Sequence, residues 1–80
     1  MFDRYPKDKV FSMEKSPKEE LQFAICERKG GKFADVRVYF IQEDGSKVPT
    51  HKGLFINVEL LPEVKKGLDR VIEAAHPKAA

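Results

Sequence analysis

The sequence has few of the residues on which disulfide-bonded, secreted or membrane-spanning proteins depend. It contains one cysteine, no tryptophan and no apolar run long enough to cross a bilayer. Because the single cysteine, Cys26, cannot form an internal disulfide, we expect a reducing compartment. Residues 1–11 also lack the apolar stretch of a signal peptide. These absences predict no membrane association, and a cytoplasmic or nucleoid location, or a nuclear one in a eukaryote.

Residues for catalysis or metal binding are equally scarce. Cys26 and His51 could serve as nucleophile and base, but Cys26 is better explained as a small residue on a strand face. Neither residue, nor His76, has the spacing of a zinc site. The acids at 43–44 lack the other ligands of a calcium loop, and residues 29–32 lack the Lys-Ser/Thr pair of a phosphate-binding loop. We therefore expect no enzymatic activity, no cofactor and no metal.

The length and the charge of the chain limit the range of possible functions further. The chain has 80 residues, enough for one small domain with a modest core, which favours association with a second copy. Its net charge of +2 arises entirely within residues 21–56, because acidic and basic side chains balance in residues 1–20 and 57–80. The excess gives the predicted sheet a mild bias toward an anionic partner.

The sequence predicts three strands followed by one helix. Alternating or β-rich stretches predict strands at 21–27, 33–42 and 48–57, joined by turns at a Gly-Gly and an Asp-Gly pair. An apolar stripe at three- and four-residue steps predicts a helix over 60–75. This order of elements indicates an α+β domain with an antiparallel sheet.

The region before these strands has a weaker pattern. Residues 1–20 are rich in charge and contain two prolines, so we expect an irregular or partly ordered arm before a domain at 21–76. Within the arm, residues 9–13 could form a short edge strand. Ser16 begins a helix-start signature, but no amphipathic run follows it, so we expect at most one helical turn.

The strand at 33–42 has two faces of different character. One face carries Phe33, Asp35, Arg37, Tyr39 and Ile41, and the other carries Ala34, Val36, Val38 and Phe40. The second face is apolar, so we expect the helix to cover it. The first face mixes aromatic rings with a guanidinium. It is bordered by three basic residues of the neighbouring turn, Arg28, Lys29 and Lys32.

The mixed face has two interpretations. Aromatic rings can stack on unpaired bases of any sequence while cations follow the phosphates, which is how single-stranded nucleic acid is bound without strict sequence reading. Alternatively, the rings cover a second core layer on an ordinary amphipathic strand. The pattern alone favours neither interpretation over the other.

Two motifs occur in a characteristic order before the helix. An Asp-x-Arg-x-Tyr-aromatic strand is formed by Asp35, Arg37, Tyr39 and Phe40. A Pro-x-x-Lys-Gly-apolar element follows, formed by Pro49, Lys52, Gly53 and Leu54. With the amphipathic helix, these motifs resemble the positive cofactor four family of transcriptional coactivators over roughly residues 21–75.

The resemblance implies both a fold and a partner. The fold is a curved antiparallel sheet of three to four strands with one C-terminal helix, assembled as a homodimer. The partner is single-stranded DNA or melted duplex, and contact with the transcription machinery is a further implication. By position, Arg37, Phe40 and Lys52 match the family's phosphate-contacting and stacking residues, and Lys29 matches a basic hairpin residue.

The chain departs from the family at three points. Arg28 stands where the family often has an aromatic residue, so one stacking platform is lost or moved to Phe33. The family's helix starts with Asn-Pro, whereas here four residues separate the asparagine from the proline. Strict alternation also places Phe40 opposite Arg37, so a bulge or strong strand twist is needed for both to contact one ligand.

Lys52 and Gly53 stand together at the entrance to an apolar strand segment. We expect Gly53 to let the strand bend or bulge and to let a nucleic-acid backbone approach closely. Lys52 would then supply a phosphate contact at the bend. The alternative is a solvated lysine before a structural glycine.

The sequence thus predicts a dimeric single-stranded DNA-binding protein of the coactivator type, acting by base stacking and phosphate neutralisation. The predicted binding residues are Arg28, Lys29, Lys32, Phe33, Arg37, Tyr39, Phe40, Lys52 and Gly53. The predicted dimer contacts lie on the helix stripe and are Leu68, Val71, Ile72 and Ala75. The competing hypothesis is a dimeric protein-interaction adaptor that captures a polypeptide on its exposed sheet or an edge strand.

Overall fold

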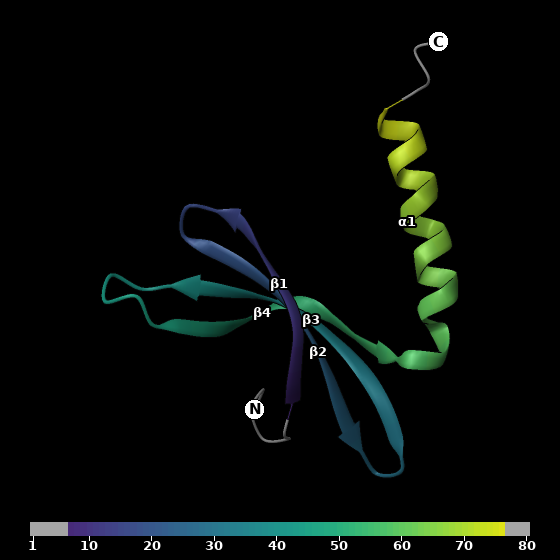
Figure 1. The fold of residues 1–80 in the computed structure, drawn as a ribbon, viewed down its shortest axis with the longest axis horizontal. Helices are drawn as coiled ribbons and strands as arrows, with labels where there is room; N and C mark the ends of the chain where they lie inside the picture. Colours follow the sequence, from purple (N-terminus) through teal and green to yellow (C-terminus); the bar gives the residue numbers. More distant parts are fainter. Residues whose placement is uncertain (1–6, 77–80) are drawn as a thin grey trace.

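One antiparallel sheet and one helix make up the computed structural model, which describes residues 7–76 (Figure 1). The strands are β1 (Lys7–Ser16), β2 (Glu19–Arg28), β3 (Gly31–Ile41) and β4 (Lys47–Asn57). They pair in chain order, each antiparallel to the next, so β1 and β4 are the two edges. A 3-10 turn, η1 (Val58–Leu60), leads into the helix α1 (Leu61–Ala75). The three predicted strands and the predicted helix are therefore all present.

The N-terminal part of the sheet differs from the prediction. Residues 7–16 form a full strand on β2, with register shifts at Val10 and Lys15, so the sheet begins before residue 21. No helical turn forms after Ser16, where at most one is expected, because the two residues that follow form the tight turn between β1 and β2. Lysines and bulges of this kind are typical of edge strands protected from further pairing. The rest of the predicted arm, residues 1–6, lies outside the described residues.

The turn between β2 and β3 is centred one residue earlier than its Gly-Gly pair suggested. Lys29 has φ 38° and Gly30 has φ 78°, the positive values of a type I′ hairpin turn. Glycine adopts this conformation freely, whereas the Cβ of a lysine is crowded in it. The fold therefore holds a lysine at the hairpin tip at some conformational cost.

The register gives the sheet one apolar face and one mixed face. The apolar face comprises Phe11, Met13, Leu21, Phe23, Ile25, Ala34, Val36, Val38, Phe40, Val48, Leu54 and Ile56. The mixed face comprises Lys7, Gln22, Cys26, Phe33, Asp35, Arg37, Tyr39 and Phe55, among others. The alternation read from residues 33–41 thus extends across all the strands of the sheet.

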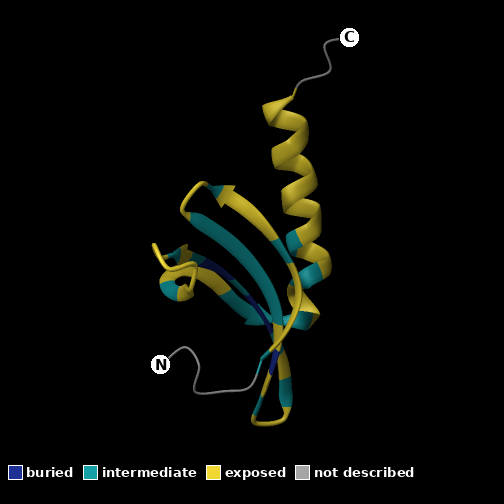
Figure 2. Ribbon diagram, turned by 60° about the vertical axis from the view of Figure 1, so that its left-hand side comes forward, coloured by how far each residue is buried: buried dark blue, intermediate teal, exposed yellow. Residues whose placement is uncertain are grey.

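The helix does not cover the apolar sheet face. Beyond η1, α1 stands away from the sheet, and none of its residues is buried (Figures 1 and 2). Leu68, Val71 and Ile72 are 58%, 61% and 57% exposed. The prediction that the helix covers this face is therefore wrong for a single chain. Two apolar surfaces, the sheet face and the helix stripe, are left without an intramolecular partner across the described residues.

The start of the helix accounts for the separated asparagine and proline. Asn57 Oδ1 accepts a hydrogen bond of 2.8 Å from the Glu59 N–H, which caps η1. Pro62 then occupies the first turn of α1, where its missing N–H costs nothing. One short 3-10 turn therefore fills the interval between the two residues. Pro77 follows the helix in the sequence, where a proline is expected to end it, and it lies outside the described residues.

Candidate nucleic-acid interface

A bulge in β4 interrupts its pairing with β3 at the second motif. Arg37 pairs with Gly53, and Tyr39 pairs with Pro49, so Val38 alone lies opposite three residues of β4. β3 itself keeps its alternation, and Phe40 therefore stays on the face opposite Arg37. The predicted bulge is present, and it reshapes β4 instead of turning Phe40 toward Arg37.

The side chain of Thr50 organises the bulge. Its Oγ1 donates a hydrogen bond of 2.7 Å to the Val38 carbonyl and accepts one of 3.2 Å from the Lys52 N–H. These bonds replace part of the interrupted ladder, as short hydroxyl side chains often do in turns. His51 and Lys52 are exposed at the bulge.

Gly53 closes the bulge because β3 and β4 approach each other more closely there than a side chain allows. A Cβ at this position would lie 2.5 Å from the Val36 carbonyl oxygen and 3.0 Å from the Arg37 Cα. Both are backbone atoms, which cannot move aside as a flexible side chain can. The structural reason for Gly53 is therefore the approach of β3, and the approach of a nucleic-acid backbone stays a prediction.

Arg37 is buried on the mixed face. Its Nε and Nη2 lie 3.1 and 3.0 Å from Asp35 Oδ1, and its Nη1 donates a 3.0 Å hydrogen bond to the Thr50 carbonyl. The other carboxylate oxygen of Asp35 lies 2.6 Å from Lys7 Nζ. Only 9% of Arg37 and 3% of Asp35 are exposed. The sequence selects Arg37 as a DNA-binding residue, which requires an accessible side chain, whereas the structure buries it.

An aromatic and cationic column stands on the mixed face near the β2–β3 hairpin. The Phe33 and Phe55 rings are stacked, with centroids 5.1 Å apart and planes 7° apart. The Arg28 guanidinium lies 5.4 Å from the Phe55 centroid, in cation–π contact. Arg28, which stands where the family often has an aromatic residue, thus extends the stack of Phe33 and Phe55. Sequence reasoning did not select Phe55, although the pairing of β3 with β4 places it beside Phe33.

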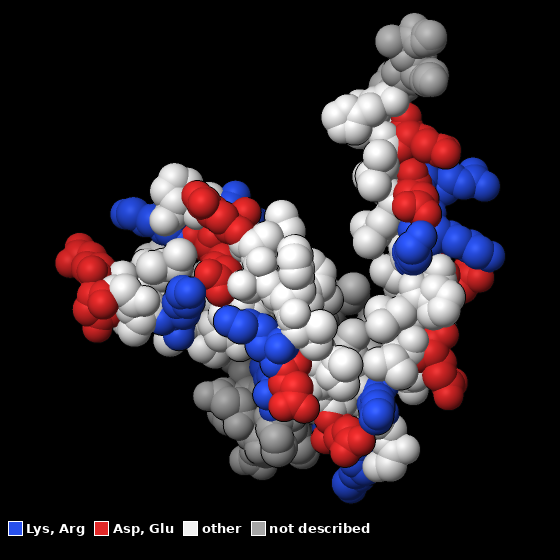
Figure 3. All heavy atoms as spheres, in the orientation of Figure 1, with Lys and Arg blue, Asp and Glu red and all other residues white. Residues whose placement is uncertain are grey.

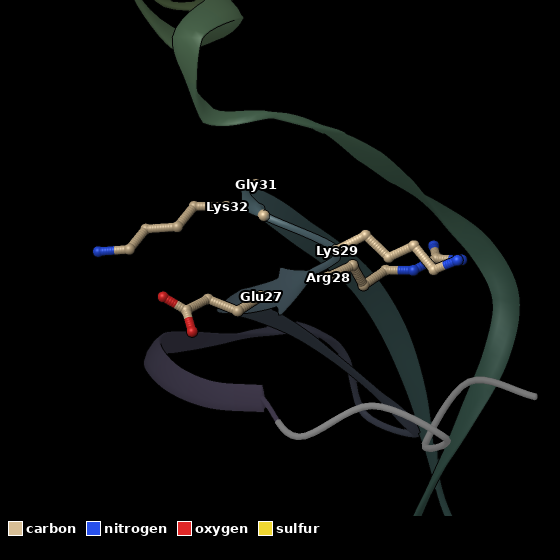
Figure 4. A pocket seen from close by; sticks show the side chains of 6 residues that line it. Glu27, Arg28, Lys29, Gly31 and Lys32 are labelled. Carbon is tan, nitrogen blue, oxygen red and sulfur yellow. The ribbon is translucent and has the colours of Figure 1, made fainter.

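The cationic side chains of the hairpin extend in two different directions. Arg28 and Lys29 extend together to one side, whereas Lys32 extends to the other side with Glu27 (Figure 4). A shallow pocket lined by residues 27–32 lies between them. The structure therefore brings Arg28 and Lys29 together and separates Lys32 from them.

Phe40 and Lys52 form a second group, at the opposite end of β3. Phe40 is 42% exposed and pairs with Glu19 of β2. The pKa of Glu19 is lowered first by a hydrogen bond from Lys15, and the nearby charge of Lys52 lowers it further. The charge of Lys52 therefore acts on the carboxylate of the residue that pairs with Phe40. About 23 Å of strand separates Phe40 from Phe33, at 3.3 Å per residue.

Two carboxylates of β2 have lowered pKa values, from which we expect the fold to be sensitive to acid. Hydrogen bonds from Lys15 and Lys47 are the main causes that lower the pKa values of Glu19 and Glu20 below the ordinary 4.5. A lowered pKa stabilises the folded state above the ordinary value, and this stabilisation is lost as the pH falls through the lowered value. We therefore expect the melting temperature to drop below about pH 4.5. In Glu20→Gln the melting temperature should drop less on acidification. An equally steep drop would contradict the role given to Glu20.

No helix within residues 7–76 has the length and apolar character needed to cross a membrane. The same residues contain no group of three or more His, Cys, Asp or Glu side chains that could hold a metal ion. Cys26 is buried on the mixed face.

Solved structures of known proteins share this architecture. In one crystal form, a PC4 homologue from Burkholderia pseudomallei superposes with a TM-score of 0.76 and 29% identity, covering 82% of this chain and 97% of that one. A second crystal form of the same homologue gives 0.75 and 28%, covering 90% and 93%. No protein-family model and no curated protein matches the sequence. The chain therefore has the PC4-like fold, that of the positive cofactor four family which its two motifs resemble.

Proposed function

We propose that the chain is a homodimeric single-stranded DNA-binding protein with a coactivator-like role. The observation that carries the proposal is the pair of cation–aromatic groups at the two ends of β3, on a PC4-like sheet. The hairpin group comprises Arg28, Lys29, Phe33 and Phe55, and the bulge group comprises Phe40, Lys52 and Gly53. Rings and cations in this combination suit unpaired bases and their phosphates.

Binding proceeds without a chemical step. Bases stack on exposed ring or guanidinium surfaces, and lysines neutralise the phosphates between them. Phe40, which is more exposed than the stacked pair on the mixed face, is the stacking residue of the bulge group. Melted duplex offers the same unpaired bases, so holding an opened promoter strand is the form that a coactivator-like role would take.

The homodimer is proposed because no part of residues 7–76 covers either apolar surface. The charged residues of α1 gather along one side of the helix, and uncharged residues line the side toward the sheet (Figure 3). That uncharged stripe includes Leu68, Val71, Ile72 and Ala75, which are all exposed. A second copy related by a two-fold axis can cover the stripe and the part of the apolar sheet face away from Phe40 at once, which leaves Phe40 exposed for stacking.

Removing the Lys52 charge tests the bulge group. Lys52→Ala should weaken binding to single strands several-fold whatever their sequence, because the contact is to phosphate. The slope of log affinity against log salt should become shallower by about 0.7, the value for one contact on a single strand. Fluorescence anisotropy over a salt series measures both. Lys66→Ala, on the charged side of α1, is the matched control and should bind as wild type. A Lys52→Ala variant that does so too would remove Lys52 from the site.

A substitution at Lys29 should change the stability of the fold and the affinity for DNA in opposite directions. Its φ of 38° suits asparagine better than lysine at the first central position of a type I′ turn. Lys29→Asn should therefore raise the stability of the fold, by up to about 1 kcal/mol, and still weaken DNA binding because a phosphate contact is lost. Thermal unfolding and anisotropy measure the two effects. If the DNA affinity of Lys29→Asn is unchanged, a phosphate contact does not explain the strained lysine in this turn.

A further inference from the structure

We infer that Arg37 and Thr50 are positioning residues, which hold the β4 bulge in the shape that presents Lys52, and that Arg37 does not itself contact DNA. The inference rests on the proposed function, since it concerns how Lys52 reaches a phosphate. It reverses the role that the sequence suggested for Arg37. Three features of the structure support it.

The first feature is the direction of the Arg37 donors. Both Nε and Nη2 are directed at Asp35, and Nη1 is directed at the Thr50 carbonyl. Asp35 is in turn held by Lys7, so the guanidinium is fixed within a buried group of charges that joins β1, β3 and β4. A phosphate would have to break these bonds and enter a site where Arg37 is only 9% exposed.

The second feature is the chain of hydrogen bonds that leads from Arg37 to Lys52. Arg37 holds the carbonyl of Thr50, and the hydroxyl of the same residue bonds the Val38 carbonyl and the Lys52 N–H. Thr50 is thus fixed through both its backbone and its side chain. The backbone of Lys52 is fixed through Thr50.

The third feature is the other end of the bulge. Gly53 follows Lys52 directly and packs against the backbone of Val36 and Arg37 without room for a Cβ. The bulge is therefore held at both ends by contacts that involve Arg37. A lysine presented on a fixed backbone loses less conformational freedom on binding than one on a mobile loop, which favours affinity.

Two substitutions separate positioning from direct contact. Thr50→Val removes the hydroxyl but no charge, so it affects DNA only through the shape of the bulge. Arg37→Lys keeps the positive charge but cannot reproduce the fork that bonds Asp35 and Thr50 together. Thr50→Ser keeps the hydroxyl and is the matched control. Each variant is also combined with Lys52→Ala.

The binding experiment is a double-mutant cycle on a labelled single-stranded oligonucleotide, read by anisotropy across a salt series. We expect Thr50→Val and Arg37→Lys each to lower affinity and the salt slope about as much as Lys52→Ala. Adding Lys52→Ala to either should then change affinity by no more than about twofold, because the contact is already lost. Thr50→Ser should bind as wild type.

Amide exchange gives a readout that does not depend on DNA. The Lys52 N–H is bonded to Thr50 Oγ1, so its hydrogen exchange in the free protein should speed up at least about tenfold in Thr50→Val and Arg37→Lys. Thermal unfolding shows which variants are folded, and Arg37→Lys decides the matter should Thr50→Val not fold.

The inference is overturned if Arg37→Lys keeps wild-type DNA affinity and salt slope. It is also overturned if the affinity losses of Arg37→Lys and Lys52→Ala multiply in the double variant, or if the amide exchange rate of Lys52 is unchanged. A different result contradicts the proposed function. If the wild type fails to bind single strands while exchange responds as expected, the positioning contacts stand and the DNA-binding role does not.

Discussion

Ile72→Asp will dissociate the proposed dimer and weaken DNA binding with it. Ile72 is 57% exposed in the single chain, so the substitution should leave the fold of one chain intact. In a dimer that covers the helix stripe, the new carboxylate is buried without a partner, which costs about 3 kcal/mol. Because a two-fold dimer buries one such carboxylate from each chain, the dimer dissociation constant should rise by at least roughly 100-fold. Melting temperature and DNA affinity fall together because dimer formation and avidity contribute to both.

Light scattering across a concentration series measures the dimer, and anisotropy measures DNA binding on the same samples. Arg70 is two residues from both Leu68 and Ile72, so it lies on the opposite side of α1. Arg70→Asp should therefore leave the dimer in place, which makes it the control. A wild-type chain that is monomeric at micromolar concentration and still binds DNA tightly would contradict the dimer. So would an Ile72→Asp variant that scatters light as wild type.

Gly53→Ala will destabilise the fold although the added group is a single methyl. Its Cβ would meet the Val36 carbonyl oxygen at 2.5 Å and the Arg37 Cα at 3.0 Å, so β3 and β4 must separate. Overpacking of this kind costs about 1–3 kcal/mol, and each kcal/mol lowers the melting temperature of a domain this small by about 4–8 °C. Because the bulge shifts, affinity for single strands should fall as well.

The same substitution elsewhere in the chain is a close control. Gly67 lies in α1, and a Cβ there would meet nothing within 4 Å. Gly67→Ala should therefore stabilise the helix by about 1 kcal/mol. Thermal unfolding of the two variants should move in opposite directions. If Gly53→Ala melts with the wild type, the close approach of the strands is not what requires the glycine.

Local patterns in the sequence were enough to place most of the elements. Alternation and turn chemistry located β2, β3 and β4, and the apolar stripe located α1. β1 was underestimated because an edge strand with charges and two register shifts has no regular period. The position of the helix was missed for a different reason. An apolar stripe shows that a helix must be covered, but not whether the cover comes from its own chain.

The site was harder to predict than the fold because its contacts cross strands. The burial of Arg37 depends on Asp35 and on Lys7, which lies two strands away, and no local pattern reports such a group. Phe55 was missed because its partner, Phe33, belongs to a different strand and is fixed only by the register. Lys52 and Gly53 were selected because they belong to a motif, and the structure supplies a packing reason for the glycine.

The central claim is that unpaired bases and their phosphates are the ligand of this sheet. It is tested most directly by titrating the wild-type chain against a labelled single strand and against the matched duplex of equal length, each at low and at moderate salt. The proposal predicts tighter binding to the single strand, because stacking needs unpaired bases, and an affinity that falls steeply as salt rises. Equal affinity for both forms, or no binding to either at low salt, would contradict it.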